Sequence, residues 1–362
     1  MKHLGLKKFT TLFVTAAMSL SLMACGDKSG STVGAAATTA EDQKAGKNLQ
    51  IVTTIFPEYD WVRQILGENP AGADITLLLD NGADLHSYQP TAEDIAKIST
   101  CDLFIYVGGE SDEWVNDALK EATNPNMAVI DLLEVLGDSA KQEEVVEGMQ
   151  ADEHDHDHEH EEGEDHEADE DHDGDAHHHD EREIEYDEHV WLSVKNAKIF
   201  VNEISEKLSA LDAANADAYK KNAEAYNVSL TELDEKYTSL FSNAKEKTLL
   251  FGDRFPFRYM IEDYGLSYYA AFIGCSAETE ASFETITFLA GKVDELGLSS
   301  IFVLEGGNHK IAETVKNSTK TRDQEIVSLN SMQSTTKQDV EAGATYLGIM
   351  EANYETLSRT VK

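Results

Sequence analysis

The chain has 362 residues and a formal net charge of −40, with 69 acidic side chains against 29 basic ones. This balance excludes nucleic-acid binding, because the chain has no basic patch that could neutralise phosphate groups. Much of the acidic excess lies in one tract, so roughly 280 residues remain for folded lobes, near the limit of what one hydrophobic core organises. We therefore expect two lobes.

The N-terminus has the pattern of a secretory signal. Lys2, Lys7 and Lys8 precede an apolar stretch at residues 9–22, and small residues lead up to Cys25. A basic segment followed by a short apolar one is typical of a signal peptide, and the stretch is too short for a comfortable membrane span. We predict a lipoprotein signal peptide at 1–24 with lipid on Cys25, which would anchor the protein on the extracytoplasmic face of a membrane or in the periplasm. An ordinary signal peptide with an incidental cysteine is the alternative.

Residues 25–48 are rich in Gly, Ser, Thr and Ala, as expected for a flexible tether. After it, strand-like and helix-like runs alternate, which implies a parallel sheet with right-handed crossovers. Residues 49–192 are therefore expected to form an α/β lobe. Its predicted strands are 49–56, 74–79, 102–107 and 127–130, and its predicted helices are 58–67, 91–100 and 112–121.

This lobe is expected to carry an insert at about 147–184. Within 152–180, nine histidines stand among sixteen carboxylates with no Lys or Arg. Almost without apolar side chains, the insert cannot bury a core and is expected to be disordered, a solvated charged loop. Its imidazole and carboxylate groups are ligands for divalent transition metals, so we predict metal capture. The histidines are His154, His156, His158, His160, His166, His172, His177, His178 and His179.

A linking helix is predicted at 193–243, because residues 193–241 contain no Pro or Gly. Capped by Ser193, it would span ~70 Å if unbroken, and a break near 212–215 is the alternative. Residues 244–362 repeat the alternation and are expected to form a second α/β lobe. Its predicted strands are 248–252, 266–272, 300–304 and 325–329, and its predicted helices are 255–264, 282–296, 309–320 and 345–361.

Ligands of open α/β sheets bind beyond the carboxyl ends of the strands, and this rule selects further metal-binding candidates. In the first lobe, His86 follows the second strand and His189 stands at the start of the linking helix. In the second lobe, the candidates in or near the loops after the strands are Asp253, Glu280, Glu305 and His309. Most have an alternative role. His86 could be a loop histidine hydrogen-bonded to backbone, and His189 could cap the start of the helix. Asp253 could pair with Arg254 or cap a helix, and the two glutamates could hold Arg254 or His309 in place.

Neither an enzymatic activity nor a disulfide bond is expected. The chain has no His-Glu-x-x-His run and no nucleophile placed beside a base, so we do not expect an enzyme. A disulfide between Cys101 and Cys275 is also not expected, because the first should enter a strand and the second should follow one in the other half.

The segments GADLHSYQP at 82–90 and DEHVWLS at 187–193 resemble the two histidine motifs of the metal-binding lipoproteins of bacterial ABC importers for zinc and manganese. The resemblance covers 49–362, and a histidine-rich acidic insert before the second motif is typical of the zinc-specific members. It implies two (βα)4 lobes joined by a rigid backbone helix, with a metal cleft between them. It also implies a monomeric receptor that delivers Zn²⁺, or alternatively Mn²⁺, to a permease driven by an ATPase.

The chain departs from this family at two ligand positions. The third ligand falls on Arg254, which has no lone pair to give, and the fourth falls near Asn330, which could give only an uncharged oxygen. Asp253 or His309 could serve instead, and if Arg254 has displaced a ligand, Arg254→His should tighten binding. Zinc is favoured because imidazoles suit borderline ions. The alternatives are a manganese or iron receptor and a metal-scavenging or adhesin lipoprotein without a transport role.

Overall fold

The computed structural model describes residues 48–150, 185–276 and 279–361. These residues belong to one compact unit, Gly46–Lys362. The predicted signal peptide, Cys25 with its tether up to residue 47, and the nine histidines of the insert lie outside the described residues. Within the described ranges, no helix combines the length and the apolar character needed to cross a membrane.

The first lobe is a four-stranded, fully parallel sheet with strand order β2-β1-β3-β4. Each predicted strand and helix is present within a few residues of its expected bounds, and a short helix that was not predicted follows the last strand. In chain order the elements are β1 (Gln50–Thr53), α1 (Phe56–Leu66), β2 (Asp74–Leu77), α2 (Ala92–Thr100), β3 (Leu103–Tyr106), α3 (Val115–Lys120), β4 (Ala128–Asp131) and α4 (Leu132–Leu136).

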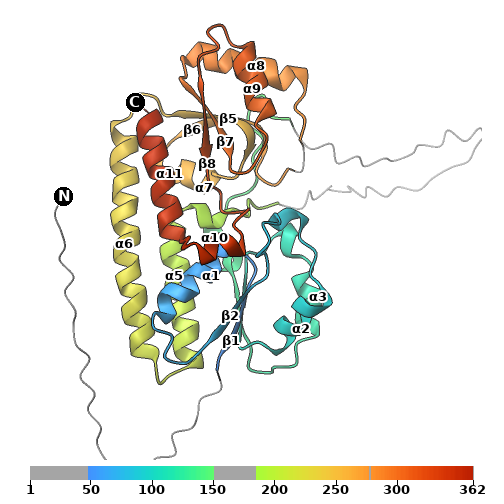
Figure 1. The fold of residues 1–362 in the computed structure, drawn as a ribbon, viewed down its shortest axis with the longest axis vertical. Helices are drawn as coiled ribbons and strands as arrows, with labels where there is room; N and C mark the ends of the chain where they lie inside the picture. The colour runs from blue at the N-terminus through green and yellow to red at the C-terminus, as the bar shows by residue number, and fades with distance from the viewer. Residues whose placement is uncertain (1–47, 151–184, 277–278, 362) are drawn as a thin grey trace, which may run out of the picture. The chain divides into compact units, whose positions relative to one another are not determined.

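The second lobe repeats this topology, with strand order β6-β5-β7-β8 and parallel pairing throughout. The two lobes lie at opposite ends of α6 (Figure 1). The prediction of two parallel sheets is therefore confirmed. The elements are β5 (Thr248–Phe255), α7 (Arg258–Tyr264), β6 (Ser267–Ile273), α8 (Phe283–Leu296), β7 (Ser300–Leu304), α9 (Lys310–Ser318), β8 (Glu325–Leu329), α10 (Lys337–Glu341) and α11 (Tyr346–Thr360).

One strand boundary corrects the sequence analysis. β5 runs on to Phe255, so Asp253 and Arg254 lie inside the strand and not in the loop after it. The pairing of β5 with β6 shifts register between Phe251 and Arg254, as it does at a β-bulge. A bulge changes the directions of side chains locally, and the sequence pattern did not show that the strand continues beyond it.

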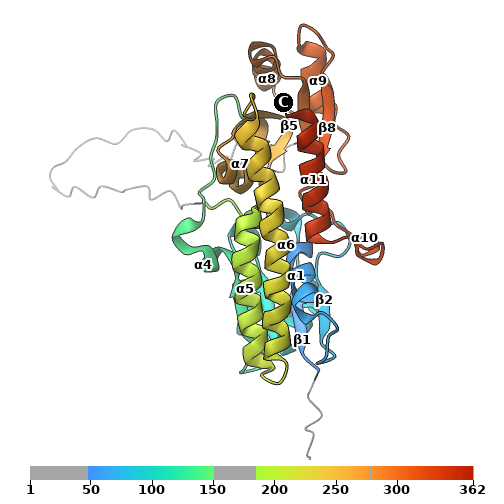
Figure 2. The ribbon, with the colours of Figure 1, turned by 90° about the vertical axis from the view of Figure 1, so that its left-hand side faces the viewer.

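The linker is a helical hairpin and not one continuous helix. α5 (Val194–Leu211) and α6 (Ala216–Asn243) pack side by side (Figure 2). The break occurs at 212–215, where the Asp212 carboxylate accepts hydrogen bonds from Asn215 Nδ2 and Tyr219 Oη, both at 2.7 Å. Ser193 caps α5 as predicted, since its Oγ accepts from Asn196 N at 3.0 Å. α6 packs on α1 of the first lobe and on α7 and α11 of the second, so it links the two lobes as a stiff element.

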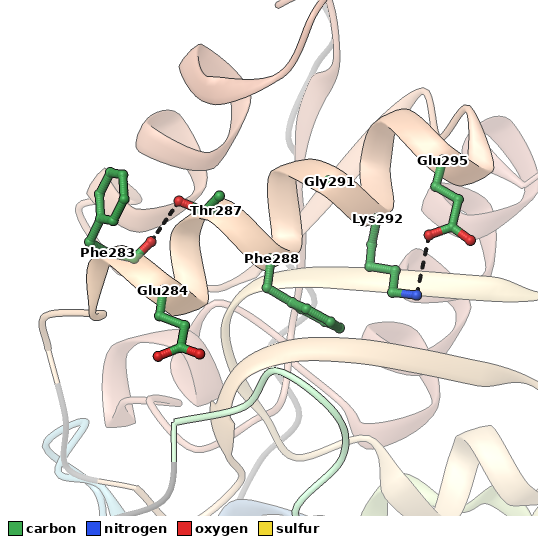
Figure 3. Close-up of a pocket in the computed structure, with 7 residues that line it drawn as sticks. All are labelled: Phe283, Glu284, Thr287, Phe288, Gly291, Lys292 and Glu295. Carbon is green, nitrogen blue, oxygen red and sulfur yellow. Dashed lines mark hydrogen bonds and ion pairs between the residues drawn. The ribbon is translucent and has the colours of Figure 1, made fainter.

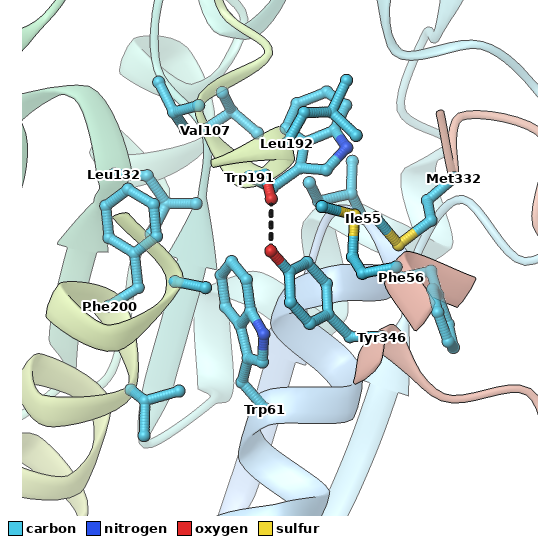
Figure 4. Packing of buried hydrophobic residues seen from close by; sticks show 14 of the residues in the cluster. Ile55, Phe56, Trp61, Val107, Leu132, Trp191, Leu192, Phe200, Met332 and Tyr346 are labelled. Atoms are coloured by element: carbon cyan, nitrogen blue, oxygen red, sulfur yellow. Dashed lines mark hydrogen bonds between the residues drawn. The ribbon is translucent and has the colours of Figure 1, made fainter. Parts of the chain in front are cut away.

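A single large core runs from the first lobe through the helices into the second. Figure 4 shows its centre, where the Trp191 carbonyl accepts a hydrogen bond from Tyr346 Oη at 2.7 Å. The Trp191 indole in turn donates to the Ser331 carbonyl at 2.9 Å, and Trp61 contacts Tyr346 edge-on. These contacts tie the start of α5 to the loop after β8. A smaller core lies between the second sheet and α8 and α9.

Candidate metal site

His86 lies on a short 3-10 turn, Leu85–Ser87, in the loop after β2. Asp84 caps this turn, because its Oδ1 accepts a hydrogen bond from His86 N at 3.1 Å. The imidazole ring is held at Nδ1, which lies 2.7 Å from Ser111 Oγ and 3.2 Å from Glu188 Oε2. A ring held at Nδ1 in this way turns Nε2 outward, as in metal-ligating histidines.

His189 is fully buried just before α5. Asp187 holds it twice, because Asp187 Oδ1 accepts from His189 N at 2.9 Å and lies 3.0 Å from His189 Nδ1. Asp187 is itself held, since its N donates to the Lys141 carbonyl and its carbonyl accepts from Tyr259 Oη. The carboxylate therefore fixes both the tautomer and the orientation of the imidazole.

The two imidazoles meet at their outer nitrogens, with 3.1 Å between His86 Nε2 and His189 Nε2. Because each Nδ1 faces a carboxylate, each Nε2 carries a lone pair. Gln333 Nε2 lies 3.2 Å from the first and 3.0 Å from the second, so its amide N–H groups donate to both. The Gln333 amide therefore occupies the position at which a cation could accept both lone pairs.

Buried acidic groups surround this pair. Burial would raise the pKa of Glu188, but its hydrogen bond and charge interaction with His86, together with the donors of Ser111, hold that pKa below its usual range. Burial raises the pKa of Asp112 to about 7, and the nearby Glu188 adds to the shift. The Glu188 side chain also needs a glycine beside it, because a Cβ on Gly109 would lie 2.3 Å from Glu188 Oε1. The site is thus built to favour a positive charge.

A third ligand-type side chain reaches the pair, and the sequence analysis did not include it. The ligand atoms of His86, His189 and Cys275 all lie within 4.8 Å of one another. Cys275 follows β6, so the rule that selected His86 could also have selected this cysteine. Cys101 and Cys275 form no disulfide with each other in the structure, and Cys101 contacts Met127. Burial and the nearby Glu143 raise the pKa of the Cys275 thiol.

The other predicted ligands of the second lobe do not join this group within the described residues. Asp253 is engaged inside its lobe, where Oδ2 accepts from Leu304 N at 3.2 Å and Oδ1 from Arg254 N at 2.9 Å. Glu280 is exposed. His309 precedes α9 in the left-handed region with φ 53°, and its buried Nδ1 lacks a hydrogen-bond partner among the described residues.

Glu305 and Asn330 shape the loop that presents Gln333. The Glu305 carboxylate accepts from Ser331 N at 2.8 Å and from Ser331 Oγ at 2.9 Å. Asn330 Oδ1 accepts from Met332 N at 2.7 Å, next to the positive φ of Met332. Both side chains are thus used to fold the loop, and Glu305 holds neither Arg254 nor His309 by any interaction that the described residues show.

Arg254 forms an ion pair with Asp84, the residue that caps the His86 turn. The pair crosses between lobes, because Arg254 lies in β5 and Asp84 in the loop after β2. Burial would raise the pKa of Asp84, but the Arg254 guanidinium holds it below its usual range. Arg254 Nη1 also lies 3.5 Å from the Ser276 carbonyl. The arginine therefore supports the ligand loops and is not itself a ligand.

A separate hollow lies on one face of α8 (Figure 3). All seven lining residues come from this helix, among them Phe283, Phe288 and Lys292. Lys292 is paired with Glu295 at 3.2 Å, and the hollow contains no histidine or cysteine. It is therefore unsuited to a transition metal.

Several known proteins are similar to this chain. Residues 51–360 match the family described as "Zinc-uptake complex component A periplasmic". Zinc-binding protein AdcA of Streptococcus pyogenes serotype M18 is 29% identical over 327 residues, which is 89% of this chain and 58% of that protein. The chain thus spans less than two thirds of the length of that relative.

Two further relatives match over nearly their whole length. High-affinity zinc uptake system protein ZnuA of Bacillus subtilis is 30% identical over 351 residues, or 97% of each chain. The crystal structure of the Zn(II)-bound ZnuA-like domain of Streptococcus pneumoniae AdcA is similar with a TM-score of 0.64 and 27% identity. That match covers 87% of this chain and 99% of the domain.

Proposed function

This chain belongs to the family of periplasmic A components of zinc-uptake complexes, and from that membership we propose that it captures Zn²⁺ outside the cytoplasm and delivers it to an ABC-type importer. The observation that carries the proposal is the pair of Nε2 atoms of His86 and His189, 3.1 Å apart and each backed by a carboxylate. Two zinc ligands in a tetrahedral site lie roughly 3.3 Å apart, given Zn–N distances of about 2.0–2.1 Å. The zinc is cargo, and the chain acts as a receptor and not as an enzyme.

The insert is proposed to gather metal for this site. Its position in the sequence supports that role. Gln150, near the start of the insert, donates from its N to the Ala271 carbonyl of β6, and the Glu185 carbonyl, just after the insert, accepts from Glu143 N. Asp187 and His189 follow within a few residues. Metal bound by the nine insert histidines would therefore be released close to the ligands.

The partners follow from the receptor role. We propose that the loaded protein, as a monomer held to the membrane through lipid on Cys25, docks on a permease that a cytoplasmic ATPase drives. His86 and His189 are the proposed ligands. Asp253 is hydrogen-bonded inside its lobe, and Glu280 and His309 do not belong to the group of converging ligand atoms within the described residues.

The test separates the site from the insert by using the full-length chain. In a background variant the nine insert histidines are replaced by glutamine, and Zn²⁺ is titrated in competition with a chelator and with Mn²⁺. We expect one tight zinc equivalent in this background, its loss on adding His86→Ala, and no change on adding His309→Ala. The last variant is the matched control, because it removes a histidine that stands apart from the pair.

Two results would contradict the proposal. If tight zinc binding disappears with the insert histidines alone, the folded site does not bind zinc tightly and the protein is a metal scavenger. If the background variant prefers Mn²⁺ to Zn²⁺, the cargo is manganese and the insert only buffers zinc.

A further inference from the structure

We propose that the Cys275 thiolate is the third protein ligand of the cargo zinc, in place of the ligand that Arg254 cannot supply, and that it biases the site against Mn²⁺. This inference rests on the proposed zinc-receptor function and deepens it. It starts from the three converging ligand atoms of His86, His189 and Cys275, which lie within 4.8 Å of one another. The described residues contain no other such group of histidine, cysteine and carboxylate side chains.

The loop that carries Cys275 is packed directly against the histidines. A Cβ on Gly274 would lie 2.8 Å from His189 Cε1 and 3.0 Å from His189 Nδ1, so no larger residue fits there without movement. Tetrahedral Zn–S and Zn–N bonds of about 2.3 and 2.0–2.1 Å place sulfur and nitrogen roughly 3.6 Å apart. From 4.8 Å at most, the thiol needs to move by about one ångström to bind with the pair.

The topology of the two lobes places the cysteine where a ligand belongs. β2 and β6 are equivalent, because each is the edge strand beside the first strand of its sheet. His86 lies in the loop after β2 and Cys275 in the loop after β6. Each lobe thus brings one metal-binding side chain to the site from the same position in its fold, in accord with binding beyond the carboxyl ends of parallel strands.

Arg254 joins these two loops. Its guanidinium pairs with Asp84 beside His86 and reaches the carbonyl of Ser276, the residue after Cys275. The residue at the family's third ligand position therefore holds the His86 loop and the Cys275 loop together. The ligand has moved from the end of β5 to the loop after β6, and the arginine supports the new arrangement.

The chemistry of this set fits zinc as a cargo. Two imidazoles and one thiolate are soft enough to favour Zn²⁺ over Mn²⁺, which prefers oxygen ligands. Binding replaces the S–H bond by a Zn–S bond and releases one proton to solvent. Three protein ligands leave the fourth position open, so the ion can be handed on, whereas closed four-ligand sites are structural.

The experiment uses the full-length background variant, in which the nine insert histidines are glutamines and cannot take up the ion, loads it with one equivalent of Co²⁺ and records its absorption spectrum. A cobalt–thiolate bond gives a strong near-ultraviolet charge-transfer band, which imidazole and carboxylate ligands do not give. We expect this band in the background variant and after adding Cys25→Ser or Cys101→Ala, and its loss after adding Cys275→Ser. Cys101→Ala is the matched control because it removes a buried thiol that contacts Met127.

A zinc and manganese titration of Cys275→Ser in the background without insert histidines completes the test. We expect zinc affinity to fall tenfold or more and manganese affinity to change less, so that the preference for zinc narrows. A spectrum of the background variant without the band, or a band that survives Cys275→Ser, overturns the thiolate ligand whether or not the Cys275→Ser protein folds well. The receptor function is judged separately, by whether the background variant keeps one tight zinc equivalent and loses it on adding His86→Ala.

Discussion

The two lobes contribute to the site in different ways. On the side of the first lobe, His86 and His189 are held at Nδ1 by Glu188 and Asp187, and both carboxylates are buried. In the second lobe, the acidic side chains of Asp253 and Glu305 are hydrogen-bonded within the lobe itself. What that lobe presents to the histidines is an amide, Gln333, and a thiol.

The difference shows that position at a strand end does not make a carboxylate a ligand. A carboxylate that accepts backbone N–H groups is already satisfied, and moving it to a metal would leave those donors unpaired at a cost of about 1–3 kcal/mol each. The first lobe instead uses its carboxylates to orient imidazoles. We infer that this half of the site is preorganised, whereas the other half adjusts when metal binds.

The sharpest way to break this comparison is to remove one carboxylate from each half. Asp187→Asn should weaken zinc binding by about 10- to 100-fold, because His189 loses the group that fixes its tautomer. The matched change Asp253→Asn should leave zinc affinity unchanged while it lowers the free energy of unfolding by about 1 kcal/mol. Competitive zinc titration and chemical denaturation measure both effects. Equal losses of zinc affinity would show that the two halves are equivalent.

The cross-lobe ion pair gives a smaller effect. If Arg254 has displaced a ligand, Arg254→His should tighten metal binding. The ion pair favours the opposite result, because this change breaks the pair with Asp84, which caps the His86 turn. We expect zinc affinity to fall by up to about tenfold, since an ion pair of this exposure contributes on the order of 1 kcal/mol. Isothermal titration calorimetry of the variant decides the question. Tighter binding would mean that a histidine in β5 can still reach the metal.

A further prediction concerns stability and not metal binding. Burial raises the pKa of Asp112 to about 7 in the folded protein, whereas an unfolded aspartate titrates near 3.9. The folded state therefore holds a proton that the unfolded state has lost, so the free energy of unfolding should decrease as pH rises from about 4 to about 7.

Asp112→Asn should remove this dependence, because an amide does not titrate and can still accept from Val107 N or Gly108 N. The measurement is chemical denaturation of both proteins, each kept free of metal by a chelator, at several values of pH across this window. The difference in stability between variant and wild type should grow with pH and then level off. A constant difference would show that Asp112 is ionised throughout the window.

Much of the fold could be predicted from the sequence. The predicted strands appear as β1 to β8, because buried parallel strands are continuous apolar runs bounded by turn residues. The hairpin of α5 and α6 was left open, because residues 212–215 contain no Pro or Gly that would require a break, and the break depends on Asp212 accepting from Asn215 and Tyr219. The end of β5 was misplaced because a bulge leaves no signal in the local pattern.

By itself, the sequence determined the fold class and the pair of histidines. Periodicity is a local property, and each of the two histidine motifs is an unbroken run of residues. The fold class and the two histidines can therefore be predicted from short stretches of the sequence. Only the tertiary structure decided which polar groups of the second lobe face the two histidines. The carboxylates of Asp253 and Glu305 accept hydrogen bonds from residues distant in the sequence. Cys275 lies near His189 because Gly274 packs closely against that histidine. Which side chains remain available to a metal thus depends on hydrogen bonds between residues far apart in the chain, and a local sequence pattern does not show these bonds.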